Sequence, residues 1–305
     1  MAKVRSNKIK DSFGDKVLNL ITAIVLFLII IVVGYPIIYV ISSSFSSTAA
    51  ISAGKVVLLP VDFSLDAYKF VLEYKQVWIG FRNSVFYTVI HVFLHMFVTI
   101  LVAFPLSRKN FQGRGVYTMI FYASTRFSAG LIATFIWRCQ LGFFDSIWAV
   151  IINGLIGVSD ILILRTCFQS TIPSELYDSA MIDGCNYFQM IWKIALPLSK
   201  ATLSVLILYT IVAQWNEYFV SMLYLRDSNL YPLQLVLRPI MQAAQGATPG
   251  MDTSNMSSAS AEMANKGLEG VRYALIVISS TPVIVAYFCV QKSFKTGVMV
   301  GSVKG

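Results

Sequence analysis

Charged side chains are scarce in this sequence. Asp, Glu, Lys and Arg make up 13% of its 305 residues, about half of the roughly 25% that is usual for a soluble domain. Cysteine and histidine are also few, with four and two copies, and no two cysteines have CxxC spacing. This excludes a zinc ribbon and a disulfide scaffold, and the isolated cysteines are expected to pack as small apolar side chains.

Apolar residues, in contrast, form 56% of the chain, and the mean hydropathy is +0.69. A soluble protein of this size could not hide so much apolar surface, so the composition predicts an integral membrane protein. The 24 basic residues exceed the 15 acidic ones, which gives a net charge of +9. In a soluble protein that excess would suggest nucleic acid. In a membrane protein it is typical of cytoplasmic loops, so we expect lipid and no nucleic acid as the partner.

Six segments are apolar enough to cross a membrane, for which a helix needs about 20 residues. They lie at 17–41, 80–104, 116–141, 146–168, 198–225 and 271–291. The first is not expected to be a cleaved signal peptide, because the apolar part of a signal peptide is typically only about 7–15 residues long. The sequence thus predicts an all-α membrane protein with six transmembrane helices.

The positions of the basic residues predict the orientation, because cytoplasmic loops are rich in Lys and Arg. The side that contains both termini has 14 Lys and Arg residues, and the opposite side has six. We therefore expect cytoplasmic tails at 1–16 and 292–305, and an outer loop at 226–270. An even number of spans agrees with two cytoplasmic ends.

The cytoplasmic segment 172–197 has the pattern of two short helices joined by a turn. Pro173 suits the first turn of a helix, and Glu175 lies where the helix dipole favours an acid. Gly184 can end that helix in a left-handed conformation, and Asn186 can cap a second one. We expect the second helix to end near Leu196, because a following proline disfavours helical backbone.

We call this two-helix segment, 172–197, the elbow. The acidic character of its first helix helps to decide between two possible roles. A helix that lies on anionic lipid would need basic residues on its polar face, but here Glu175, Asp178, Ser179 and Asp183 share one arc. Leu176, Tyr177, Ala180 and Met181 are expected on the opposite arc. Docking into a protein partner fits these charges better than adsorption on lipid.

At these residues the chain resembles a family. IPSELYDSAMIDGC followed by YFQMIWKIALP is similar to the EAA loop of bacterial ABC importer permeases, with Asp178, Ser179 and Cys185 as mild departures. AFPLSRKNFQGR, the Trp215-Asn216-Glu217-Tyr218 stretch and the tail QKSFKTGVMVGSVKG resemble the sugar-transporting branch. The similarity is to the second permease subunit of maltose-type importers, closest to the lipoprotein/complex-oligosaccharide subgroup of Gram-positive bacteria.

The resemblance implies a type I ABC importer permease fold in the bacterial cytoplasmic membrane. The implied partners are a second permease, two ATPase subunits, an extracellular solute-binding lipoprotein and a carbohydrate substrate. The chain lacks a G-x-x-x-x-G-K-[ST] phosphate loop, so ATP and Mg²⁺ would bind the ATPases, and this subunit would be no enzyme and hold no cofactor. The elbow would be the coupling helix, with contacts from Pro173, Glu175, Leu176, Asp178, Ala180, Ile182, Asp183 and Gly184.

Polar residues inside the spans are candidates for the sugar path, because charges there usually face a cavity or a partner. Arg126, Asn216 and Glu217 are the candidates, and each could instead make only structural hydrogen bonds. Glu217 and Asp160 are possible partners of Arg126. Arg126 could also face the cavity and recognise a polar or acidic sugar. The alternative function is an ion-coupled secondary transporter that uses Arg126, Asp160 and Glu217. No metal site is expected at His91 and His95, because no acidic third ligand is near them in sequence.

Overall fold

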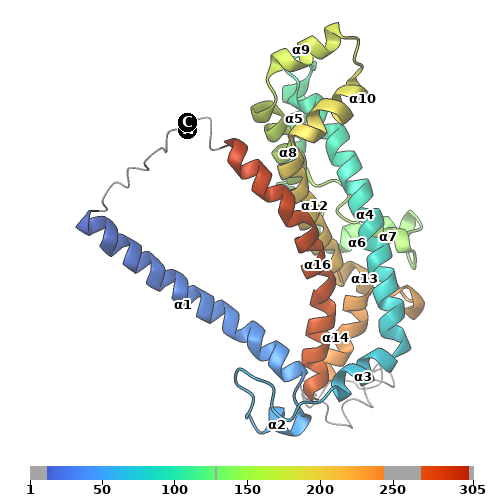
Figure 1. Cartoon of the computed structure of the whole chain (residues 1–305). Helices are drawn as coiled ribbons and strands as arrows, with labels where there is room; N and C mark the ends of the chain where they lie inside the picture. Colours follow the sequence, from blue (N-terminus) through green and yellow to red (C-terminus); the bar gives the residue numbers. More distant parts are fainter. Residues whose placement is uncertain (1–11, 128, 244–268, 302–305) are drawn as a thin grey trace.

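The computed structural model describes residues 12–127, 129–243 and 269–301, and these are mostly helical. In the described part the only β-type pairing is one isolated bridge between Ser46 and Phe63. Three long helices dominate Figure 1: α1 (Phe13–Ser44), α4 (Lys75–Ser107) and α16 (Glu269–Gly301). In the described residues these three are long and apolar enough to cross a membrane. They coincide with the first, second and sixth predicted spans.

The third, fourth and fifth predicted spans are each divided by a break. The pairs are α5 (Arg114–Ser124) with α6 (Leu131–Gln140), α7 (Ile147–Ile151) with α8 (Val158–Thr171), and α12 (Lys200–Trp215) with α13 (Phe219–Tyr224). Gly130 and Gly154 lie in the first two breaks with φ of +78° and +69°, which a right-handed helix cannot contain. The count of six spans therefore stays a prediction, and these three are not continuous helices.

Short helices gather at both ends of α4 (Figure 1). α9 (Ser174–Ile182) and α10 (Tyr187–Met190) lie near its C-terminal end. The helices at the other end are α2 (Thr48–Ser52), α3 (Asp66–Glu73), η2 (Ser228–Leu230) and α14 (Leu233–Ala243). α14 lies in the first part of the predicted outer loop 226–270.

Two apolar cores follow from this arrangement. One joins the C-terminal half of α4 to α8, α9 and α12, and its largest fully buried side chains include Phe168, Ile161, Leu164 and Leu206. The other joins the N-terminal half of α4 to α3, α14 and α16 around Leu233, Leu237 and Leu275. Helix α4 therefore takes part in both cores and links the two ends of the molecule.

Helix α1 stands apart from the helices of the bundle along most of its length (Figure 1). Its apolar side chains from Val17 to Ile41 are largely exposed, and burial begins at Ser42. The Tyr39 ring packs edge-on against Tyr273 of α16, with centroids 5.7 Å apart. Such an apolar surface is expected to be covered by lipid or by another membrane subunit.

The last helix extends beyond the sixth predicted span, 271–291. Helix α16 continues to Gly301, so part of the predicted tail 292–305 is helical. Residues 1–11, 244–268 and 302–305 lie outside the described residues, and with them most of the predicted N-terminal tail and of the outer loop 226–270.

Gly80 provides a test of the packing between α4 and α14. A Cβ atom at this position would lie 3.1 Å from both Leu233 Cα and Val236 Cγ2. We expect Gly80→Ala to destabilise the fold by about 1–3 kcal/mol, because overpacking a close contact forces the backbones apart. The measurement is thermal unfolding of the detergent-purified permease.

Gly34→Ala is the matched control, because Gly34 also lies in a long helix but has no atom within 4 Å of the added carbon. It should be neutral or slightly stabilising, because alanine favours a helix over glycine. Equal behaviour of the two variants would contradict a tight α4–α14 contact.

Candidate functional site

The elbow between α8 and α12 has the local structure that the sequence predicts. Helix α9 starts directly after Pro173 and ends at Ile182, and Gly184 follows with φ +77°. Asn186 then caps α10: its Oδ1 accepts from the Gln189 backbone N–H, while its own N–H donates to Gln189 Oε1. This reciprocal pair is a capping box, so the turn is defined by its own residues.

Tyr177 fixes α9 to the end of α4. Its side chain is buried, its ring centroid lies 5.9 Å from that of Phe104, and the Arg108 guanidinium carbon lies 3.8 Å above the ring. Burial raises the pKa of the Tyr177 phenol to about 12, although the Arg108 charge acts in the opposite direction. The ring is therefore a neutral anchor at physiological pH, strengthened by a cation–π contact.

In the part of the chain that the structure describes, the opposite side of α9 is largely exposed. Ile182 is 87% exposed, Leu176 and Met181 are also exposed, and so are the three acids of the helix and its turn. Within the predicted apolar arc, Tyr177 and Ala180 are buried whereas Leu176 and Met181 are exposed. An exposed apolar tip flanked by acids is a surface suited to a protein partner.

The second half of the elbow does not end where the sequence predicts. The chain continues from α10 through a π-helical turn, Ile191–Ala195, into α11 (Leu196–Leu198). Pro197 lies inside that last turn, near its start, where its missing N–H needs no partner. The axis then bends by 87° at Ser199 before α12. The elbow is thus one bent helical unit joined directly to the fifth predicted span.

A polar cavity of about 290 Å³ lies between α4, α8 and α12. Its lining includes His91 and His95 from α4, Asn153 and Asp160 from the fourth predicted span, and Gln214 and Glu217 from the fifth. Glu217 Oε1 accepts the backbone N–H of Val220 at 2.8 Å, so this carboxylate caps the helix after the α12–α13 break. Glu217 is therefore both a structural residue and a residue of the cavity wall.

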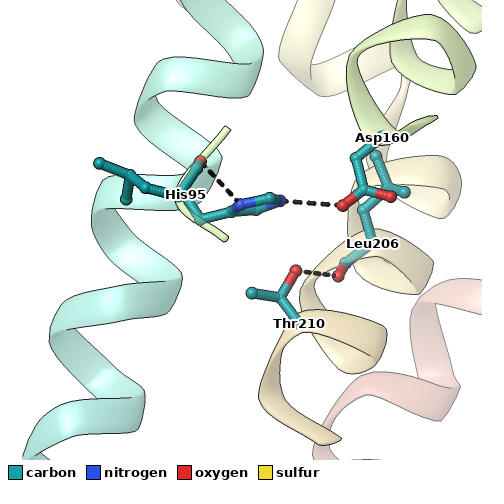
Figure 2. A network of polar contacts seen from close by, with 5 residues as sticks. His95, Asp160, Leu206 and Thr210 are labelled. Atoms are coloured by element: carbon teal, nitrogen blue, oxygen red, sulfur yellow. Dashed lines mark hydrogen bonds and ion pairs between the residues drawn. The ribbon is translucent and has the colours of Figure 1, made fainter. Parts of the chain in front are cut away.

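His95 and Asp160 meet in this cavity, as Figure 2 shows. The distance from His95 Nε2 to Asp160 Oδ2 is 2.9 Å, and His95 Nδ1 lies 3.0 Å from the Leu155 carbonyl oxygen. The sequence does not reveal this pair, because the two residues are 65 positions apart and only the fold brings them together. An acid does lie beside the histidines, contrary to the expectation, yet the described residues contain no group of three or more metal-ligating side chains.

Arg126 and Asn216 make local hydrogen bonds and are not among the residues that line the polar cavity. Arg126 is exposed and donates to the Tyr122 hydroxyl at 2.7 Å, so its partner is neither Glu217 nor Asp160. Asn216 donates to the Val212 carbonyl of its own helix and does not belong to the cavity wall. Of the three predicted path residues, only Glu217 lines the polar cavity.

The chain is similar in sequence and fold to known ABC transporter permeases. No protein-family model matches the chain. It is 37% identical over 270 residues to the polygalacturonan/rhamnogalacturonan transport system permease protein YtcP of Bacillus subtilis (strain 168), covering 88% of this chain and 92% of that protein. Protein LplC of the same strain is 34% identical over 270 residues, which is 88% of this chain and 89% of LplC.

A solved structure agrees. It is a bacterial ABC transporter involved in the import of the acidic polysaccharide alginate, and one of its chains matches with a TM-score of 0.82 and 32% identity, over 94% of this chain and 100% of that one. The fold is thus that of an ABC importer permease. The chain belongs to the permeases of carbohydrate ABC transport systems. This membership overturns the alternative of an ion-coupled secondary transporter.

Tyr177 allows a test of how the elbow is held. Tyr177→Ala should destabilise it by about 3–5 kcal/mol, as for other large aromatic truncations in a core. Tyr177→Phe should be neutral, because the buried hydroxyl has no hydrogen-bond partner in the described residues. Limited proteolysis within 172–197 measures the effect, and equal cleavage of both variants and the wild type would contradict the anchoring role.

Proposed function

We propose that this chain forms half of the translocation path of an ATP-driven oligosaccharide importer and couples to a cytoplasmic ATPase through the elbow 172–197. The exposed tip of α9 carries this proposal. Its apolar and acidic side chains are exposed, and none of its acids forms an ion pair within the described part of the chain, while its other face is fixed to α4. A helix that is fixed on one face and exposed at its tip can transmit movement between a bound partner and the transmembrane spans.

The proposed assembly has a second permease, two ATPase subunits and an extracellular solute-binding lipoprotein, with both termini of this chain in the cytoplasm. ATP and Mg²⁺ are bound by the ATPases. The contacts on this side come from residues of α9 and its turn, namely Pro173, Glu175, Leu176, Asp178, Ala180, Ile182, Asp183 and Gly184. Of these, Ala180 is buried, so its role is to let α9 pack closely.

Gly184 is the sharpest test of coupling. Its φ of +77° is strained for any other residue, and it stands at the exposed end of α9. Gly184→Arg should leave the permease in the membrane but reduce copurified ATPase by roughly tenfold, which corresponds to about 1.4 kcal/mol of binding free energy. Asp183→Ala should weaken the same contact to a smaller extent.

Gly142→Arg is the matched control, because Gly142 has φ +80°, also lacks neighbours within 4 Å, and lies in the loop after α6. Backbone strain alone would affect both variants equally. Normal ATPase copurification and transport in Gly184→Arg would refute the coupling role.

The proposed substrate is an oligosaccharide that contains acidic sugars. The Arg126 guanidinium has five N–H donors. Among the described residues no carboxylate lies within ion-pair distance of it. Charged residues in membrane spans usually mark a path or a partner. YtcP is named for the transport of polygalacturonan and rhamnogalacturonan. The similar solved structure is described as a transporter involved in the import of the acidic polysaccharide alginate.

Arg126→Ala should therefore raise the apparent KM for trigalacturonate by roughly tenfold, as expected for one lost charge-assisted hydrogen bond. Arg126→Lys should retain part of the affinity because it keeps the charge. Uptake by the reconstituted importer measures both. An unchanged KM in Arg126→Ala would show that this residue does not bind the sugar.

A further inference from the structure

The break between α7 and α8 is held against α4 by two histidines. His91 Nδ1 lies 2.6 Å from the Ile151 carbonyl oxygen, and His95 Nδ1 lies 3.0 Å from the Leu155 carbonyl oxygen. Because a carbonyl oxygen can only accept, Nδ1 of each ring must carry its proton. The two side chains thus satisfy backbone groups that a continuous helix would have paired internally.

Because Nδ1 of His95 carries a proton, the remaining question is whether the other ring nitrogen, Nε2, carries one too. Nε2 faces Asp160 Oδ2 at 2.9 Å (Figure 2). A neutral His95 with its proton on Nδ1 and an ionised Asp160 would place two lone pairs against each other. One further proton between Nε2 and Oδ2 removes the conflict, as an imidazolium beside a carboxylate or as a neutral imidazole beside a carboxylic acid. In both forms the pair has no net charge.

Gly157 lies directly against the His95–Asp160 contact. A Cβ atom there would lie 2.7 Å from His95 Cε1 and 2.8 Å from Asp160 Oδ2. Any side chain at this position would separate the pair, so its close approach depends on a bare backbone.

We propose that His95 is a positioning residue that holds one proton against Asp160 and so keeps an unmatched carboxylate out of the polar cavity. Asp160 is 28% exposed there, whereas His95 is 4% exposed. The other titratable groups around the cavity are His91, Tyr209 and Glu217. With the pair neutral, Glu217 is the remaining acid of the wall, and an anionic sugar meets less repulsion. The effect on transport rests on the proposed function, but the protonation of the pair does not.

The first test reads the proton directly in the purified importer complex. ¹⁵N-histidine NMR, with His95→Gln as the subtraction control, reports whether Nε2 carries a proton. Infrared difference spectra against Asp160→Asn report whether Asp160 is a carboxylate or a carboxylic acid. We expect either a doubly protonated His95 or a protonated Asp160. A singly protonated His95 beside an ionised Asp160 would overturn the proposal.

The second test uses rescue, which distinguishes charge from packing. His95→Gln leaves Asp160 unmatched, and we expect uptake of trigalacturonate to fall by roughly tenfold, because an unpaired charge in a span is strongly unfavourable. Asp160→Asn should stay close to the wild-type rate, since the amide can donate to Nε2. The double variant, which combines His95→Gln with Asp160→Asn, should recover most of the lost uptake. A double variant as impaired as His95→Gln would assign His95 a packing role only.

Gly157→Ala should reproduce the defect of His95→Gln, with Gly34→Ala as the control that has no neighbours. Wild-type uptake in Gly157→Ala would contradict the dependence on close approach. If the wild-type importer does not take up trigalacturonate, the proposed substrate fails, but the NMR and infrared results still decide the state of the pair.

Discussion

Backbone hydrogen bonding at membrane depth is the constraint on which this structure depends. Lipid offers no hydrogen bonds there, so backbone groups freed where a span is interrupted need partners from side chains, neighbouring helices or a cavity that holds water. His91 and His95 serve the α7–α8 break, and the Glu217 carboxylate serves the α12–α13 break. The polar residues in the core of the bundle are thus the consequence of broken helices. The same breaks create the polar cavity between α4, α8 and α12.

Helix α4 connects this cavity to the elbow. It contributes both histidines, and at its C-terminal end Phe104 and Arg108 pack on Tyr177 of α9. The elbow also continues through the 87° bend into α12, whose residues form another wall of the cavity. Under the proposed coupling role, a partner bound at the tip of α9 would therefore act on the cavity by two packed routes. Interfaces of this kind move as rigid bodies between discrete arrangements, which suits alternating access.

The elbow could be predicted from sequence because its signals are local. Pro173, Gly184 and Asn186 each act on neighbouring backbone, and the long apolar runs define α1, α4 and α16 in the same way. The breaks and the His95–Asp160 pair could not, because periodicity does not report a contact between residues 65 positions apart. For Arg126 the sequence suggests distant acids as partners, whereas the contact in the structure is local. A charge in a span signals the need for a partner, but Tyr122, one helical turn away, meets it in part.

The choice of histidine and aspartate at the α4–α8 contact follows from these demands. A leucine at position 95 would fill the space but would leave the Leu155 carbonyl unpaired in a medium without water. An asparagine has a shorter side chain, and its single amide group would contact either the Leu155 carbonyl oxygen or the Asp160 carboxylate, but not both. Imidazole presents two nitrogens on opposite sides of a rigid ring, so one residue joins the backbone of the break to a carboxylate at the start of α8. Aspartate completes the arrangement because it accepts the second proton, or returns it, without any change in the net charge of the site.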